Sequence, residues 1–139
     1  MEIDPLEAVI TWLETALTTV DGRVAAKHRY GDDWADSATG VSVHLDGGAP
    51  DLYAQIGVSR FEMRIYAQDD QVPIVNVWRE LVRLSRENKR FVQTTSNGDA
   101  LIHYFLPGSM LSLIYDEVLN KELGIVFFES MISEVAVSN

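Results

Sequence analysis

Hydrophobic and polar residues alternate along the stretch from Gln55 to Ala67, which predicts one long β-strand. Small or apolar side chains fall on one side of this strand, and Arg60, Glu62 and Arg64 fall on the other. A strand with one apolar and one charged face does not lie in the middle of a packed layer. We therefore expect the charged face to meet water, a partner protein or a channel.

A first helix is predicted over residues 5–19, where hydrophobic positions recur at helical spacing. Asp4 suits the N-cap, Pro5 suits the first helical position, and Glu7 suits the third position of a capping box. Trp12 lies off the main hydrophobic stripe of this helix. It either packs at the edge of the stripe or provides a second contact surface.

A second amphipathic helix is predicted to follow the long strand and to end near Asn88. Either Asp69 or Asp70 caps its start, and Pro73 lies in its first turn. One side of this helix is expected to face the core with Ile74, Val77, Trp78, Leu81 and Leu84. The residues expected to face away from the core are Asn76, Arg79, Glu80, Arg83, Arg86 and Glu87.

Short strands separated by loops are predicted for the rest of the N-terminal half. Residues 24–30 fit a short strand, and residues 31–40 are polar and turn-rich. Residues 41–45 alternate in the manner of a second strand, and residues 46–51 read as a second loop.

In the C-terminal half, Asn97-Gly98 stands between two alternating runs, at 90–95 and 99–106, and predicts a β-hairpin. Pro107 and Gly108 end the second strand of that hairpin. Residues 110–119 fit a helix or a strand, and we favour a strand. A turn at 120–124 and a final strand at 125–137 complete the prediction.

Together these elements predict one α+β domain over residues 1–139, with a single, mostly antiparallel β-sheet and two α-helices packed on one face. The helices are expected to cover the side of the long strand that carries Phe61, Met63 and Ile65. The side that carries Arg60 is left uncovered.

Composition narrows the function classes. A chain of 139 residues with 47% hydrophobic content suits one globular domain. The net charge of −10 disfavours a surface that grips DNA phosphates. No run approaches the roughly 20 apolar residues of a membrane span. The sequence has no cysteine, which excludes disulfides and thiolate metal sites and fits a reducing compartment.

No residue pattern indicates catalysis. His28, His44 and His103 fall on separate predicted strands without metal-ligand spacing, and Asp116-Glu117 has no evident partner for acid–base work. Nucleophile-elbow, P-loop and dinucleotide-binding motifs are missing. We therefore expect a protein that is not an enzyme and that needs no cofactor or metal.

The acidic loop at 31–40 is the second candidate contact region. Asp32, Asp33 and Asp36 lie close together there, but the spacing and terminal glutamate of an EF-hand are missing. Trp34 stands among these acids, and an exposed tryptophan in a polar loop is typical of an interface anchor. It either contacts a partner or folds back onto the domain.

The run Arg60-Phe61-Glu62-Met63-Arg64-Ile65-Tyr66-Ala67, followed by a helix with Val77-Trp78-Arg79-Glu80-Leu81, resembles the tail terminator proteins of long-tailed bacteriophages. The opening Asp4-Pro5-Leu6-Glu7-Ala8-Val9 is similar as well. So is the ending, where Asn120-Lys121-Glu122-Leu123-Gly124 precedes a strand that closes on Glu134-Val135-Ala136-Val137. The likeness is one of pattern over nearly the whole chain, in a family without diagnostic catalytic residues.

This resemblance implies a virion structural protein at the neck, assembled in the host cytoplasm. Such proteins form six-membered rings that sit on the finished tail tube and stop its polymerisation. The ring then meets the head-side neck proteins and leaves a central channel through which DNA passes without specific binding. The implied partners are other copies of the chain, the tail tube protein and a head-side connector protein, and no membrane is involved.

On this view Arg60, Glu62 and Arg64 lie at a subunit interface or line the lumen. The loop with Asp32, Asp33 and Trp34 contacts a partner ring. Two alternatives stay open. One is another head–tail connector protein of similar topology. The other is a small-ligand-binding or enzymatic α+β domain, with a pocket between a curved sheet and its helices.

Overall fold

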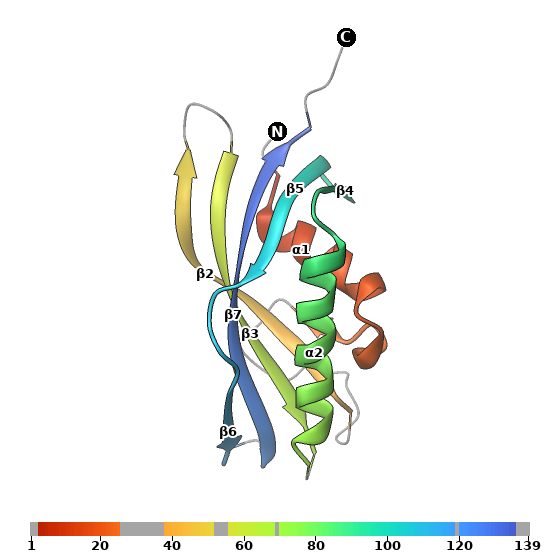
Figure 1. Cartoon of the computed structure of the whole chain (residues 1–139), viewed down its shortest axis with the longest axis vertical. Helices are drawn as coiled ribbons and strands as arrows, with labels where there is room; N and C mark the ends of the chain where they lie inside the picture. Colours follow the sequence, from red (N-terminus) through yellow and green to blue (C-terminus); the bar gives the residue numbers. More distant parts are fainter. Residues whose placement is uncertain (1–2, 26–37, 52–55, 69, 119, 136–139) are drawn as a thin grey trace.

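The computed structural model describes residues 3–25, 38–51, 56–68, 70–118 and 120–135. Within these residues, seven strands form one sheet, and both helices lie against one of its faces (Figure 1). The sheet has the order β1-β2-β3-β7-β5-β4, and β6 pairs with β7. Only the β1–β2 pair is parallel among the described pairs. The predicted α+β class is therefore confirmed.

The elements follow one another along the chain in the predicted order of helix, strands, helix and strands. Their bounds are α1 (Pro5–Ala16), the 3-10 helix η1 (Thr18–Val20), β1 (Val24–Ala25), β2 (Gly40–Asp51), β3 (Ile56–Ala67), α2 (Val72–Glu87), β4 (Phe91–Thr95), β5 (Gly98–Pro107), β6 (Ser112–Asp116) and β7 (Lys121–Glu134).

The start of α1 is capped as predicted, because the side chain of Asp4 accepts a hydrogen bond of 3.0 Å from the backbone N–H of Leu6. Glu7 was predicted to complete a capping box, but its carboxylate binds a different part of the chain. It accepts hydrogen bonds from the backbone N–H and the hydroxyl of Ser96, at 2.7 and 2.9 Å. These bonds tie α1 to the turn between β4 and β5.

The first helix is shorter than predicted, because Leu17 adopts an extended backbone and the chain continues as η1. Trp12 is buried within the core, with its ring centre 4.7 Å from that of Phe91 and 5.1 Å from that of Phe105. Of the two alternatives for Trp12, packing at the edge of the stripe is correct, and a second contact surface is wrong.

The second helix ends at its C-cap Asn88 as predicted, but its N-cap residue is Gln71, whose side chain makes no capping bond. The side chain of Asp70, one residue earlier, accepts a 2.9 Å hydrogen bond from the backbone N–H of Val72. Asp69 lies outside the described residues. One position is wrong: Glu80 was expected to face away from the core, but it is buried.

The loop predicted at 46–51 and the turn predicted at 120–124 are both wrong, because strands extend into them. Residues 46–51 belong to β2, where a register irregularity between Leu45 and Gly48 lets the strand continue beside β3. Likewise, residues 121–124 belong to β7, because β6 pairs with all four of them and β3 pairs with residues 122–124. The hairpin at Asn97-Gly98 and the strand favoured within 110–119 are confirmed.

The core lies between the helices and the face of β3 that carries Phe61, Met63 and Ile65, all fully buried as expected. Gly124 of β7 lies at the edge of this core, beside the start of α2. A Cβ atom at Gly124 would lie 2.5 Å from Cγ2 of Ile74 and 3.0 Å from Cδ1 of Leu111. The close approach of β7 to α2 therefore requires glycine at this position.

Replacing Gly124 by alanine should lower the free energy of unfolding by about 1–3 kcal/mol, as measured by urea denaturation. Ile74 is fully buried and β-branched, so its Cγ2 cannot swing away from the added methyl group. Gly108→Ala is the matched control. A Cβ there would lie at an ordinary 3.6 Å from the carbonyl oxygen of Phe127, so little change is expected. Equal effects of the two substitutions would contradict this explanation.

Candidate assembly surface

Arg60, Glu62 and Arg64 point to the face of the sheet that the helices do not cover, because they alternate with the buried residues of β3. They are not equally accessible. The exposed fraction is 53% for the side chain of Arg60, 29% for that of Arg64 and 12% for that of Glu62. Arg60 is therefore the member of the trio that a partner can reach.

Arg64 is held within its own chain. Its Nε donates a 2.6 Å hydrogen bond to Oε1 of Glu62, and it also forms a hydrogen bond with Tyr66. The bond to Glu62 raises the pKa of Arg64, although burial acts in the opposite direction. Burial also raises the pKa of Tyr66, whose residue is almost fully enclosed. This part of the sheet face is therefore a closed polar network and not an open charged surface.

Arg60 lies over an aromatic ring. Its Cζ is 4.6 Å from the ring centre of Phe127 on β7, and its Nε is 4.0 Å from a carboxylate oxygen of Asp46. A guanidinium over a ring gains cation–π energy and keeps its flat surface available to a partner. Glu129, which is exposed, lies opposite Arg60 in the neighbouring strand. This corner of the sheet offers both charge signs beside an aromatic ring.

A second exposed region, at and around β6, was missed by the sequence reasoning. Most of its residues are solvent-exposed on both sides of the strand. Within the described part of the chain, β6 pairs only with β7, so its other edge has no strand beside it. Consecutive apolar residues usually indicate a buried strand, which is why sequence reasoning could not find this exposure. The large exposed apolar side chains here are Met110, Leu113, Ile114, Tyr115 and Val118.

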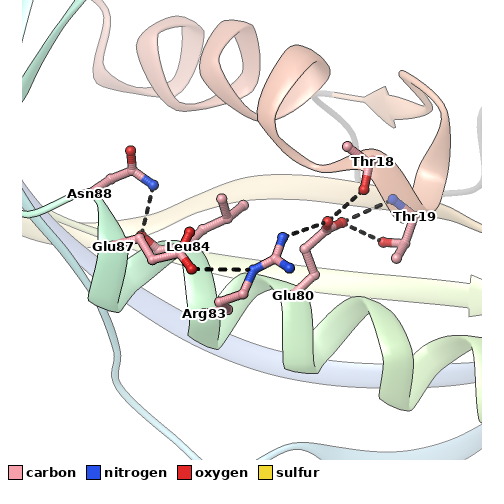
Figure 2. A network of polar contacts seen from close by, with 7 residues as sticks. All are labelled: Thr18, Thr19, Glu80, Arg83, Leu84, Glu87 and Asn88. Atoms are coloured by element: carbon pink, nitrogen blue, oxygen red, sulfur yellow. Dashed lines mark hydrogen bonds and ion pairs between the residues drawn. The ribbon is translucent and has the colours of Figure 1, made fainter.

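A polar network joins α2 to the end of the first helical segment (Figure 2). One carboxylate oxygen of Glu80 accepts from the hydroxyl of Thr18 at 2.6 Å, and the other accepts from the N–H and the hydroxyl of Thr19, each at 2.9 Å. Arg83 donates to the same carboxylate at 3.2 Å and lies 3.8 Å from Glu87. The network fixes η1 against α2, which is a structural role.

Burial alone would raise the pKa of Glu80. The hydrogen bonds from Thr18 and Thr19 and the charge of Arg83 together outweigh burial, so the pKa of Glu80 is lowered. The carboxylate is therefore ionised in the folded protein near neutral pH.

The second predicted contact region, with Asp32, Asp33, Trp34 and Asp36, lies outside the described residues, as does His28. His44 and His103 lie on β2 and β5, and β3 and β7 run between these two strands. Nε2 of His103 is 2.8 Å from the hydroxyl of Ser133. The two described histidines therefore do not come together, whereas a pocket site would need such groups to converge.

Within the described residues, no group of three or more His, Cys, Asp or Glu side chains could hold a metal ion. No described helix has the length and apolar character that crossing a membrane requires. In the comparisons with known proteins, no family model matches the sequence, and no curated protein matches it either.

Proposed function

We propose that this chain is a ring-forming structural protein of a phage virion, a tail terminator at the neck. Copies of the chain would form a ring on the finished tail tube, stop its polymerisation and join the tail to the head-side neck proteins. The ring would assemble in the host cytoplasm and would require no catalytic site. DNA would pass through its centre without specific binding.

The observation that carries this proposal is the set of exposed contact groups that lie outside the helix-covered core. Arg60 lies over Phe127 beside Asp46 and Glu129, and β6 presents apolar side chains and an edge with which no described strand pairs. Exposed apolar patches and free strand edges are typical of sites where other chains bind. The order of helices and strands resembles that of tail terminator proteins. On this basis we assign the general assembly role to the end of a tail tube.

The charge distribution agrees with a channel for DNA. The chain carries a net charge of −10, and the charge of Arg64 is taken up by Glu62. A surface that neutralises many phosphates would hold the genome and oppose its movement. A channel lined by charges that are already paired within the protein would not hold the phosphates of DNA in this way.

The test is assembly by an Arg60→Glu variant. We expect this substitution to impair ring formation, because it replaces the accessible cation by an anion next to Asp46 and Glu129. Multi-angle light scattering gives the mass in solution, and negative-stain imaging gives the shape. Because the Arg60 side chain is half exposed, the urea midpoint should change little.

Two comparisons make the result specific. The double variant Thr94→Glu with Asn97→Glu has the same change in net charge, on exposed positions of β4 and the β4–β5 turn that belong to no proposed contact, and should still form rings. The exchange Glu62→Arg with Arg64→Glu keeps the ion pair and the net charge. It therefore tests whether ring formation depends on the order of these two charges along β3. Normal rings from Arg60→Glu would remove Arg60 from the interface. A wild-type monomer without annular particles would instead favour the ligand-binding alternative.

A further inference from the structure

Four positively charged side chains along the C-terminal half of α2 and just after it are exposed: Arg79, Arg86, Lys89 and Arg90. We call this group the basic end of α2. Among the described residues, none of these side chains takes part in a hydrogen bond or an ion pair. The other described cations do have partners: Arg23, Arg60, Arg64, Arg83 and Lys121. Within the described residues, unpaired positive charge is thus concentrated at one place in an acidic chain.

The helix dipole explains only part of this concentration. Cations are favoured in the last turn of a helix, and the effect falls off beyond that turn. It accounts for Arg86 and for the residues just after α2. Arg79, however, lies two turns before the end of the helix. The dipole therefore does not explain the full extent of the basic group.

The region around β6 has the opposite charge. Asp70 and Glu117 are exposed, and Asp116 and Glu122 are partly exposed, around the apolar side chains described above. We call these acids, together with Met110, Leu113, Ile114, Tyr115 and Val118, the β6 end. Its one cation in the described residues, Lys121, is buried and donates to Gln68 at 3.0 Å. An apolar centre with a charged rim is the usual anatomy of a protein interface.

The two regions lie at opposite ends of α2 (Figure 1). Gln71, just before the helix, donates a 3.3 Å hydrogen bond to Glu122, which places the β6 end beside the start of α2. The helix has 16 residues, so it is about 24 Å long. That length exceeds the Debye length of about 8 Å at physiological salt. The two regions therefore cannot neutralise each other within one copy.

We infer that the β6 end of one copy docks on the basic end of α2 of the next copy. This inference rests on the proposed ring function and names a contact between neighbouring copies that would build the ring together with the corner at Arg60. Copies with a net charge of −10 repel each other unless regions of opposite sign meet. Two different regions joined head to tail make a heterologous contact, which gives a ring when the rotation closes. Val92, exposed and two residues after Arg90, adds apolar surface on the receiving side.

The experiment uses the full chain and two charge-reversed variants. Arg79→Glu with Arg86→Glu changes the basic end and moves the net charge from −10 to −14. Glu117→Lys with Glu122→Lys changes the β6 end and moves it from −10 to −6, with two units for each reversal. Each variant alone should need a protein concentration about 10-fold higher or more to form rings. An equimolar mixture of the two variants should regain assembly.

The two variants also control for total charge. If general repulsion governed assembly, the variant with charge −6 would assemble better than wild type, whereas the docking contact predicts that it assembles worse. Light scattering in about 50 mM and about 500 mM salt adds a second criterion, because screening should weaken wild-type assembly. Far-UV circular dichroism and urea midpoints establish that both variants fold.

The outcomes separate this inference from the proposed function. Wild-type rings that neither reversal impairs would overturn the docking contact and leave the ring function standing. A wild-type protein that forms no rings would overturn both. If wild-type protein binds duplex DNA in fluorescence anisotropy and Arg79→Glu with Arg86→Glu abolishes this binding, the basic end is a phosphate-binding surface and the inference is wrong.

Discussion

Replacing Phe105 by alanine should lower the free energy of unfolding by about 3–5 kcal/mol, the largest effect that we expect from a single substitution. The side chain is fully buried on β5. Its ring stacks on that of Phe128 with centres 4.6 Å apart, and it meets the ring of Trp12 edge-on at 5.1 Å. Phe105 therefore joins α1 to two strands of the sheet. Its removal leaves a cavity between layers that cannot easily collapse.

Urea denaturation of the wild type and of Phe105→Ala measures this loss, provided that the m-value is unchanged. If the alanine variant does not fold, Phe105→Leu keeps the test available, with an expected loss of about 1–2 kcal/mol because part of the volume remains. Val92→Ala, at an exposed position of β4, should stay within about 0.5 kcal/mol of wild type. A loss below about 1 kcal/mol for Phe105→Ala would mean that the aromatic cluster is not central to stability.

Glu80→Ala should have the second largest effect, a loss of about 2–4 kcal/mol. A buried carboxylate that accepts hydrogen bonds from Thr18 and Thr19 is removed, and the backbone N–H of Thr19 loses its partner. Arg83 also loses the nearer of its two carboxylate partners and keeps only Glu87. Because these contacts join segments about 60 residues apart, the loss should appear in global unfolding.

Glu87→Ala is the matched control for Glu80→Ala. Glu87 lies on the same helix and also faces Arg83, but its side chain is largely exposed. Its removal should lower the free energy of unfolding by no more than about 0.5 kcal/mol. Equal losses for the two variants would show that the contacts of Glu80 with Thr18 and Thr19 contribute nothing.

The contribution of Glu80 should also depend on pH. Its pKa is lowered in the folded protein from an ordinary value of 4.5, mainly through hydrogen bonds that outweigh burial. A lowered carboxyl pKa stabilises the fold fully above the unfolded-state value, and this stabilisation is lost as the pH falls through the folded-state value. The difference in unfolding free energy between wild type and Glu80→Gln should therefore shrink below about pH 4.5. A constant difference down to pH 3 would contradict this.

Several elements could be predicted because their signals are local. Asp4 caps the first helix at the expected place, Asp70 accepts a hydrogen bond from the first residue of the second helix, and Asn97-Gly98 forms the expected hairpin turn. The alternation along β3 identified the residues that the helices cover. Each signal depends on a residue and its near neighbours, so knowledge of the tertiary structure was not needed.

The candidate surface was predicted only in part, for reasons that concern neighbours in space. Alternation placed Arg60, Glu62 and Arg64 on one face correctly, but it could not separate the accessible Arg60 from the paired Arg64. The pairing of residues 121–124 with β6, and of residues 122–124 also with β3, turned an expected turn into strand. The exposure of β6 could not be predicted for the same reason. Its hydrophobic sequence indicates a buried strand, and only the position of the strand at the end of the sheet shows that it is exposed.

Periodicity and capping, read from the chain alone, thus established the α+β class, both helices and the two-faced long strand. The folded arrangement alone decided that Glu80 is buried against Thr18, that Arg64 is neutralised by Glu62 and that the side chains of β6 remain exposed. The physical reason is the distance along the chain over which each effect acts. Backbone preferences act over a few residues, whereas burial and charge pairing depend on which distant segments meet when the sheet and helices pack.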